Sequence, residues 1–384
     1  MKQKELIEKE KENNYRILTE CPYCSAKLVK RGLRKKKYET VQLYYCKHCK
    51  KKITPAITKN RTYPLKVIID SLTFYNKLIP LNTIPELIKE KYGIKITSRI
   101  ISKWLDEFKQ YLPFLRMRGF VSKKYNKKEL IEESKLIHQQ IYNFKYHRAK
   151  LNLILNDDFK HFKFKPLQEF LELVIAECPH QLFNKTTKRA SEYKDKFNLD
   201  QVKITPKTNF ATKITNFVIQ SVSKNKLRHE TLQDFMLFND TTTIAVEIPI
   251  ILNSEDIRHY KHELNFDVPL TLNDDQYITG HIDLIQVRNG SIYILDYKPS
   301  ARKVKPIAQL TLYALALSRL TGIRLFHFKC AWFDKDNYYE FFPLHVVYKL
   351  KSKKRIDKSQ TILSCISFTL LTMFVVVTNF KRLL

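Results

Sequence analysis

Glycine is scarce in this sequence, with six residues in 384. Glycine-rich loops that hold nucleotide phosphates need several closely spaced glycines, and the sequence contains neither a P-loop nor a Gly-x-Gly-x-x-Gly pattern. We therefore expect no nucleotide cofactor. Acidic residues are also few: the sequence has 38 Asp and Glu but 69 Lys and Arg, which gives a net charge of +31. This excess predicts a polyanionic partner, either nucleic acid or an acidic membrane surface.

Long disordered stretches are not expected, because 44% of the residues are hydrophobic and 12% are aromatic. A chain of this composition can bury a core. Residues 1–16 are polar and charged, without the apolar stretch of a secretory signal. We therefore expect a cytoplasmic protein associated with nucleic acid.

The cysteines are too few and too scattered for a disulfide framework, but four of the seven form two close pairs. Cys21 and Cys24 make one Cys-x-x-Cys pair, and Cys46 and Cys49 make the other. Four thiolates on two tight turns fit tetrahedral Zn²⁺, and a site filled by four sulfurs is structural rather than catalytic. A redox pair or four unrelated thiols are the alternatives. His48, inside the second pair, is expected to face solvent, with exchange for one ligand as the other option.

Residues 64–112 predict three short helices. The first begins after Pro64, and the second begins with the capping-box pattern Thr83-Ile-Pro-Glu86. Gly93 ends the second helix, and Thr97 or Ser98 caps the third, which extends to Tyr111.

The second and third of these helices predict a helix-turn-helix, because they are joined by a turn that contains glycine. Arg99 and Lys103 fall on the polar side of the third helix. The alternative is an ordinary small helical bundle.

Residues 18–112 resemble the DNA-binding front end of insertion-sequence transposases. The resemblance is carried by Cys-Pro-x-Cys, Lys30-Arg31-Gly32, Tyr-Tyr-Cys before the second pair, and the helix-turn-helix. It implies DNA recognition, with the third helix in the major groove and with Lys30 and Arg31 on phosphates. Residues 113–200 show no spaced trio of transposase carboxylates and predict a mostly helical, polar stretch, with helices over 130–155 and 166–175.

Two carboxylates and a lysine are predicted to meet at the end of a sheet. Asn289-Gly290 is a two-residue hairpin signal between alternating strands. The hairpin places the strand of Asp283 beside that of Asp296 and Lys298, which point to one face because side chains alternate along a strand. Carboxylates in this arrangement hold Mg²⁺ or Mn²⁺. The alternative is a structural salt-bridge network on a sheet edge.

Other residues around this site offer further contacts. His229 and Glu247 are upstream candidate metal ligands, and Gln309 and Tyr313 lie one turn apart on an expected helix over 306–320. A basic loop before that helix carries Arg302 and Lys303, which could hold a DNA phosphate.

Residues 224–330 resemble the PD-(D/E)XK nuclease superfamily, closest to its RecB-type branch. The resemblance is carried by Gly-His-Ile-Asp283, Asp296-Tyr-Lys298 and Gln309-x-x-x-Tyr313, in that order. It implies metal ligation by His229, Glu247, Asp283, Asp296 and the backbone carbonyl of Tyr297, and catalytic roles for Asp283, Asp296, Lys298 and Gln309. Cys330 and Cys365 cannot supply the iron–sulfur cluster of some relatives, and helicase motifs are lacking, so a stand-alone nuclease module is expected.

The segment 359–380 contains 22 residues without a charge and follows a basic stretch. As a helix it would span about 33 Å, enough for a ~30 Å hydrocarbon core. A single-pass membrane anchor with the bulk of the protein in the cytosol is one interpretation. An added strand or helix, or a non-native end, is the other.

These patterns predict a multidomain protein with a zinc ribbon, a small all-α helix-turn-helix, and an α/β domain in which helices flank a mixed, restriction-endonuclease-like sheet. The expected boundaries are 18–60 for the ribbon, 61–115 for the helix-turn-helix, 116–204 for a helical linker, and 205–350 for the nuclease-like domain. The leading hypothesis is a Mg²⁺- or Mn²⁺-dependent DNA nuclease with structural zinc, acting on single- or double-stranded DNA. A non-catalytic DNA-binding regulator and a mobile-element protein are the alternatives.

Overall fold

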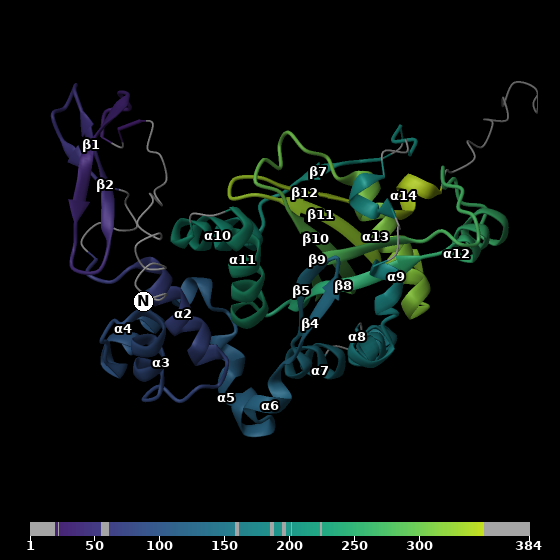
Figure 1. The fold of residues 1–384 in the computed structure, drawn as a ribbon, viewed down its shortest axis with the longest axis horizontal. Helices are drawn as coiled ribbons and strands as arrows, with labels where there is room; N and C mark the ends of the chain where they lie inside the picture. The colour runs from purple at the N-terminus through teal and green to yellow at the C-terminus, as the bar shows by residue number, and fades with distance from the viewer. Residues whose placement is uncertain are drawn as a thin grey trace, which may run out of the picture. The chain divides into compact units, whose positions relative to one another are not determined.

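Most of the described chain folds around a mixed β-sheet (Figure 1). The computed structural model describes residues 20–21, 23–54, 61–157, 161–184, 188–193, 197–200, 202–222 and 225–348. Across the main sheet of this described part, eight strands follow in the order β4 (Glu132–His138), β5 (Gln140–Tyr146), β8 (Thr243–Leu252), β9 (Ile278–Arg288), β10 (Ser291–Tyr297), β11 (Phe328–Phe333), β12 (Tyr338–Phe341) and β7 (Thr205–Pro206). A ninth strand, β6 (Lys188–Arg189), pairs with β9.

The centre of the sheet is a hairpin followed by a helical crossover. β9 and β10 pair antiparallel through Asn289 and Gly290, whose φ angles of 52° and 68° give the two left-handed turn residues that a two-residue hairpin needs. From β10 the chain passes through α13 (Ile307–Thr321) to β11, which pairs parallel with β10. Gly322, with φ of 66°, ends α13. The hairpin and the helix were both predicted from the sequence, and both are confirmed.

Both faces of the sheet are covered by helices. On one face, Ile292 and Ile294 of β10 pack into a hydrophobic core with α13, α7 (Arg148–Asp157) and α8 (Lys165–Glu177). On the other face, Tyr293 and Leu295 pack with α10 (Phe210–Val218) and α11 (Asn225–Asn239). This is the mixed sheet with flanking helices that was predicted. The shorter helices are α5 (Leu115–Lys124), α6 (Lys127–Leu130), α9 (His180–Asn184), α12 (Ser254–Arg258) and α14 (Leu344–Val347).

The N-terminal part contains a small sheet and three helices. The small sheet is β1 (Leu28–Lys35), β2 (Thr40–Cys46) and β3 (Lys52–Ile53). The helices are α2 (Leu65–Asn76), α3 (Ile84–Tyr92) and α4 (Ser98–Phe108).

The ends of these helices follow the sequence signals, with one exception. Gly93 has φ of 67° and caps α3, and the Thr97 side chain accepts a hydrogen bond from the backbone N–H of Ile100 at the start of α4. The capping box expected at Thr83 is wrong, because the backbone of Thr83 is already helical and its side chain makes no capping hydrogen bond.

The three helices share a hydrophobic core with α10 and α11. Tyr111 stacks on Phe217 with ring centroids 4.3 Å apart, and Asn76 donates a buried hydrogen bond of 2.8 Å to Asn239. The described residues up to Val347 belong to one compact unit. The separate domains expected at 61–115 and 205–350 are therefore in close contact.

The helical prediction for 130–155 is wrong over 132–146, where β4 and β5 form an antiparallel hairpin at the end of the main sheet. Phe144 and Tyr146 are fully buried on one side of β5, so burial of alternate residues stabilises a strand here. The turn is the single residue Gln139, with φ of 61° and without a glycine or proline signal. The region expected to be a linker thus supplies part of the nuclease-like sheet.

The predicted membrane anchor at 359–380 lies outside the described residues. Among the residues that are described, no helix is both long enough and apolar enough for a membrane crossing.

Candidate active site and metal centre

Four cysteine sulfurs converge at one end of the small sheet. The Sγ atoms of Cys21 and Cys49 lie 3.6 Å apart, those of Cys24 and Cys46 lie 3.5 Å apart, and all four lie within 4.8 Å of one another. The residue after each pair, Ser25 or Lys50, has φ of 55°, which turns the chain back at both knuckles. The cluster is compatible with a zinc ribbon, as predicted. His48 is exposed and is not among the converging side chains.

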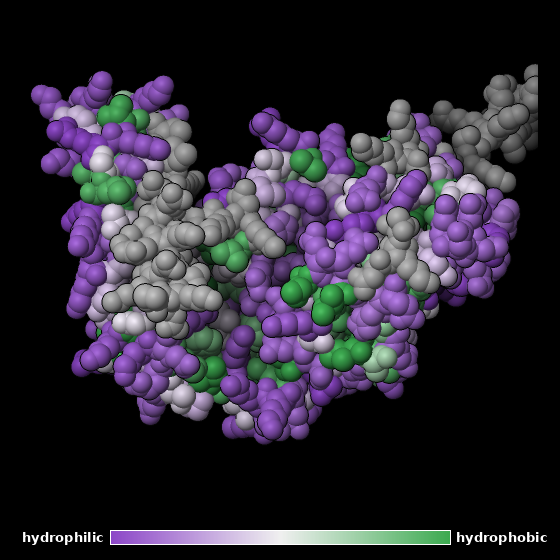
Figure 2. All heavy atoms as spheres, in the orientation of Figure 1, coloured by the Kyte–Doolittle hydropathy of each residue, from purple (hydrophilic) through white to green (hydrophobic). Residues whose placement is uncertain are grey.

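The face of the ribbon seen in Figure 2 is mostly hydrophilic, with a few hydrophobic side chains. The Lys30 and Arg31 side chains are exposed on β1, and the Arg31 guanidinium lies 4.6 Å from the centroid of the Tyr45 ring on β2. On α4, the side chains of Arg99 and Lys103 are also exposed, while Ile101 and Trp104 face the core.

The predicted carboxylates and lysine meet where β9 and β10 run side by side. Asp296 is 2% exposed, and its Oδ2 lies 2.8 Å from the Nζ of Lys298. Asp283 of β9 accepts a hydrogen bond of 3.2 Å from the backbone N–H of Tyr297 through Oδ2. The hairpin therefore places both carboxylates and the lysine in one cluster.

A helix and a neighbouring strand add further groups to this cluster. His229 on α11 has Nδ1 at 3.5 Å from Oδ2 of Asp283. One turn later, Gln233 donates to Oε1 of Glu247 at 2.6 Å and to the backbone carbonyl of Asp283 at 3.3 Å. Glu247 of β8 has φ of 54°, a left-handed conformation that is strained for a residue with a side chain and recurs at functional sites.

The carboxylates repel one another electrostatically. Burial and then the charge of Asp283 raise the pKa of Glu247 to about 7. Burial and the same charge raise the pKa of Asp296 well above its usual value. Burial alone would raise the pKa of Asp283, but the hydrogen bond and charge of His229 lower it. A bound cation would offset this repulsion and favour the ionised form of all three carboxyl groups.

These acids raise the pKa values of Lys298 and His229. Burial would lower the pKa of Lys298, but the charge of Asp296 raises it. Burial would also lower the pKa of His229, but its contact with Asp283 raises it.

The donor set fits a divalent metal. The buried Oδ2 of Asp296 makes no hydrogen bond, since its contact with Lys298 lacks hydrogen-bond geometry. Carboxylate oxygens are the ligands that Mg²⁺ and Mn²⁺ prefer. The cluster is looser than the cysteine site, because within the described residues no three of these acids and His229 have ligand atoms all within 4.8 Å of one another.

Tyr313 of α13 lies against β9, the strand of Asp283, and Gly280 of β9 makes room for its ring. Gln309 donates a hydrogen bond of 2.8 Å to the Tyr313 hydroxyl. A Cβ atom on Gly280 would lie 2.6 Å from Cε1 of Tyr313. The glycine three residues before Asp283 therefore allows the Tyr313 ring to lie against the β9 backbone.

The loop between β10 and α13 presents Arg302 and Lys303 to solvent. The loop is fixed by Ala301, whose N–H donates to Oδ2 of Asp334 and whose carbonyl accepts from the Trp332 indole, both at 2.9 Å.

Gln233 was not identified from the sequence. The signal that could have found it is its position four residues after His229, on the same face of α11. Its contact with Glu247 depends on how α11 lies across the sheet, which the sequence pattern does not specify.

Comparison with known proteins supports the sequence interpretation of this region. The sequence model of the PD-(D/E)XK nuclease superfamily matches residues 224–339. This range contains the β8–β11 part of the sheet, α11, α13 and all the clustered side chains. Neither the curated proteins nor the solved structures contained a significant match.

Proposed function

We propose that this protein is a metal-dependent nuclease that hydrolyses phosphodiester bonds in DNA. A PD-(D/E)XK nuclease superfamily domain occupies residues 224–339. The observation that carries the proposal is the contact of Asp283, Asp296 and Lys298 at one end of that domain's central hairpin. Three ionisable groups with shifted pKa values in a single cluster are typical of a catalytic site.

In this proposal Asp283 and Asp296 are the principal ligands of Mg²⁺ or Mn²⁺, with His229, Glu247 and the carbonyl of Tyr297 as further ligands. A bound divalent ion would lower the pKa of a coordinated water and neutralise charge on the phosphate. Lys298 stays protonated beside Asp296 and binds the scissile phosphate or orients the attacking water. Gln233 positions Glu247, and Gln309 and Tyr313 line the α13 side of the site.

The N-terminal part supplies DNA affinity in this proposal. The α3–α4 pair acts as a helix-turn-helix, with Arg99 and Lys103 of α4 directed to the major groove. Lys30 and Arg31 of the ribbon, and Arg302 and Lys303 beside the active site, contact phosphates. The proposal is supported by the exposure of all six side chains and by the net charge of +31. Zinc at Cys21, Cys24, Cys46 and Cys49 has a structural role.

A cleavage and binding experiment with Lys298→Ala tests the proposal. Full-length protein is incubated with end-labelled linear DNA and Mn²⁺, and DNA binding is measured in parallel without metal. We expect the parent to cleave, and Lys298→Ala to lose roughly 10²–10⁴-fold in cleavage rate while its binding changes little.

Lys329→Ala is the matched control, because Lys329 lies on the adjacent strand β11 and donates to the Tyr293 hydroxyl rather than to an acid. It should cleave like the parent. Salt-sensitive binding without cleavage by the parent would favour a DNA-binding regulator and contradict the nuclease. Equal cleavage by the parent and Lys298→Ala would remove the lysine from the mechanism.

A further inference from the structure

A further cluster of side chains that could hold a metal ion lies outside the region that matches the nuclease superfamily. It consists of His138 at the end of β4, Cys178 after α8 and His180 at the start of α9, whose ligand atoms all lie within 4.8 Å of one another. These residues are 40 and 2 positions apart in the sequence, and the fold alone brings His138 to the other two.

The histidines form a short chain of ring nitrogens. Nε2 of His138 lies 2.7 Å from Nδ1 of His180, and Nδ1 of His138 lies 2.9 Å from Nε2 of His281. His138 is 3% exposed and His281 is 6% exposed. A neutral imidazole has one N–H, so His138 can donate in only one of its two short contacts.

We propose that His138 Nε2, His180 Nδ1 and Cys178 Sγ bind one Zn²⁺ ion. Two imidazoles and a thiolate are ligands that Zn²⁺ accepts, and three protein ligands leave the fourth tetrahedral position for water. Ligand nitrogens in a tetrahedral site are about 3.3 Å apart at Zn–N distances of ~2.0–2.1 Å. A small rotation of the partly exposed His180 ring opens the present 2.7 Å separation to that value.

The surroundings of His138 suit a metal ligand. With Nε2 on the metal, Nδ1–H of His138 can donate to Nε2 of His281, an outer hydrogen bond that fixes the ring as a carboxylate or carbonyl does in other metal sites. The His138 ring also stacks on Phe183 with centroids 4.0 Å apart, and His281 stacks on Tyr142 at 3.5 Å. The ring is thus held in place before any metal binds.

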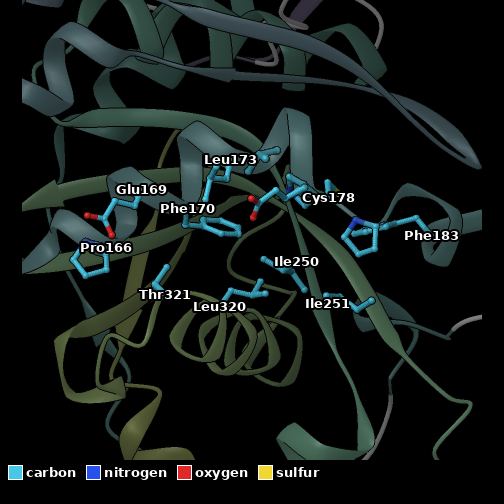
Figure 3. A pocket seen from close by; sticks show the side chains of 14 residues that line it. Pro166, Glu169, Phe170, Leu173, Cys178, Phe183, Ile250, Ile251, Leu320 and Thr321 are labelled. Atoms are coloured by element: carbon cyan, nitrogen blue, oxygen red, sulfur yellow. The ribbon is translucent and has the colours of Figure 1, made fainter.

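A mostly apolar pocket of about 340 Å³ borders this cluster at Cys178 and Phe183. Figure 3 shows Phe170, Leu173 and Cys178 on one side of the pocket, facing Ile250 and Ile251 on the other.

The proposed ion would connect β4 to the α8–α9 connection, and the hydrogen bond between His138 and His281 links both to β9. β4 and the α8–α9 connection precede the matched region, whereas His281 lies on β9, two residues before Asp283. Zinc would therefore fix the β4–β5 end of the sheet to the strand that carries a catalytic carboxylate. The proposal does not depend on nuclease activity, because metal content is its readout.

The test measures zinc per chain by mass spectrometry after full-length protein is loaded with ZnCl₂ and gel-filtered. Cys178→Ser and His180→Gln should each contain one zinc less than the parent. His262→Gln, which changes an exposed histidine elsewhere, should contain as much zinc as the parent. With Co²⁺ in place of zinc, Cys178→Ser should lose part of the thiolate-to-cobalt absorption and keep the part from the ribbon.

Zinc contents equal to the parent in both variants would overturn the proposal. Circular dichroism controls for misfolding, and His180→Gln decides the outcome if Cys178→Ser fails to fold, because His180 is partly exposed on a short helix. DNA cleavage is measured separately on the same samples, so a failed nuclease assay leaves this result intact.

Discussion

The cysteine cluster of the ribbon and the carboxylate cluster of the main sheet are built in opposite ways. The ribbon's four candidate ligands lie within residues 21–49, on two knuckles, and its hydrophobic cluster has five buried residues, two of which are the ligands Cys21 and Cys46. The candidate ligands of the carboxylate site come from α11, β8, β9 and β10, between two large hydrophobic layers. We therefore expect the ribbon to need a metal in order to fold, and the main sheet to fold without one.

We expect the largest contrast when a cysteine is changed to serine in each of the two regions and proteolysis of the ribbon is compared. Cys46→Ser removes a zinc ligand, and we expect the ribbon to unfold while the main sheet stays intact. Trypsin should then cut rapidly at the lysines and arginines of 28–52. Cys330→Ser, which changes a buried cysteine of the main core, should leave ribbon cleavage at the parent rate. A ribbon equally protected in Cys46→Ser and the parent would show that zinc does not hold it.

Packing at Gly280 tests the idea that the carboxylate site depends on a preformed sheet. Gly280→Ala places a methyl group against the Tyr313 ring, and we expect a loss of about 1–3 kcal/mol in the free energy of unfolding. Gly119→Ala is the control, since a Cβ there meets nothing within 4 Å and an alanine in α5 stabilises a helix by up to about 1 kcal/mol. Urea denaturation measures both. An unchanged stability in Gly280→Ala would show that Tyr313 moves freely.

A smaller effect on stability, which depends on pH, is expected from a buried histidine of the main core. His147 is fully buried, whereas His48 of the ribbon is exposed. Burial, and then the charge of Lys150, lower the pKa of His147 well below 6.5. Below pH 6.5 the unfolded chain binds a proton that the folded chain does not, so stability should fall as the pH falls, by up to about 1.4 kcal/mol per unit.

His147→Asn provides the comparison for this pH dependence, because an asparagine side chain can still accept from the backbone N–H of Lys150, as Nδ1 of His147 does. Urea denaturation at pH 7 and pH 5 should show a smaller loss of stability in the variant. An identical loss in both proteins would mean that His147 does not contribute.

Local signals allowed much of the fold to be predicted from the sequence. The Cys-x-x-Cys pairs predicted the knuckles, Asn289-Gly290 predicted the hairpin, and Gly322 predicted the end of α13, because each acts through the few residues around it. The β4–β5 hairpin was missed because such local signals are weak there. Its turn residue, Gln139, carries no turn signal, and the alternation of Tyr142, Phe144 and Tyr146 is short.

The contacts of the candidate site also fall into local ones, which could be predicted, and long-range ones, which could not. Asp283, Asp296 and Lys298 could be placed together because a hairpin joins their strands within 15 residues. The contact of Gln233 with Glu247, and that of His138 with His180 and His281, join residues 14 to 143 positions apart. Such contacts depend on how helices and distant strands pack, which local patterns do not specify.

Binding of Mn²⁺ to the carboxylates is the central claim, and a thermal shift measures it without requiring cleavage. Zinc-loaded full-length protein and Asp283→Asn are melted with and without Mn²⁺. Asparagine keeps an acceptor for the Tyr297 N–H but removes the charge. We expect Mn²⁺ to raise the Tm of the parent, as a ligand of the folded state must, and to leave that of Asp283→Asn nearly unchanged. An equal shift in both proteins, or none in the parent, would contradict it.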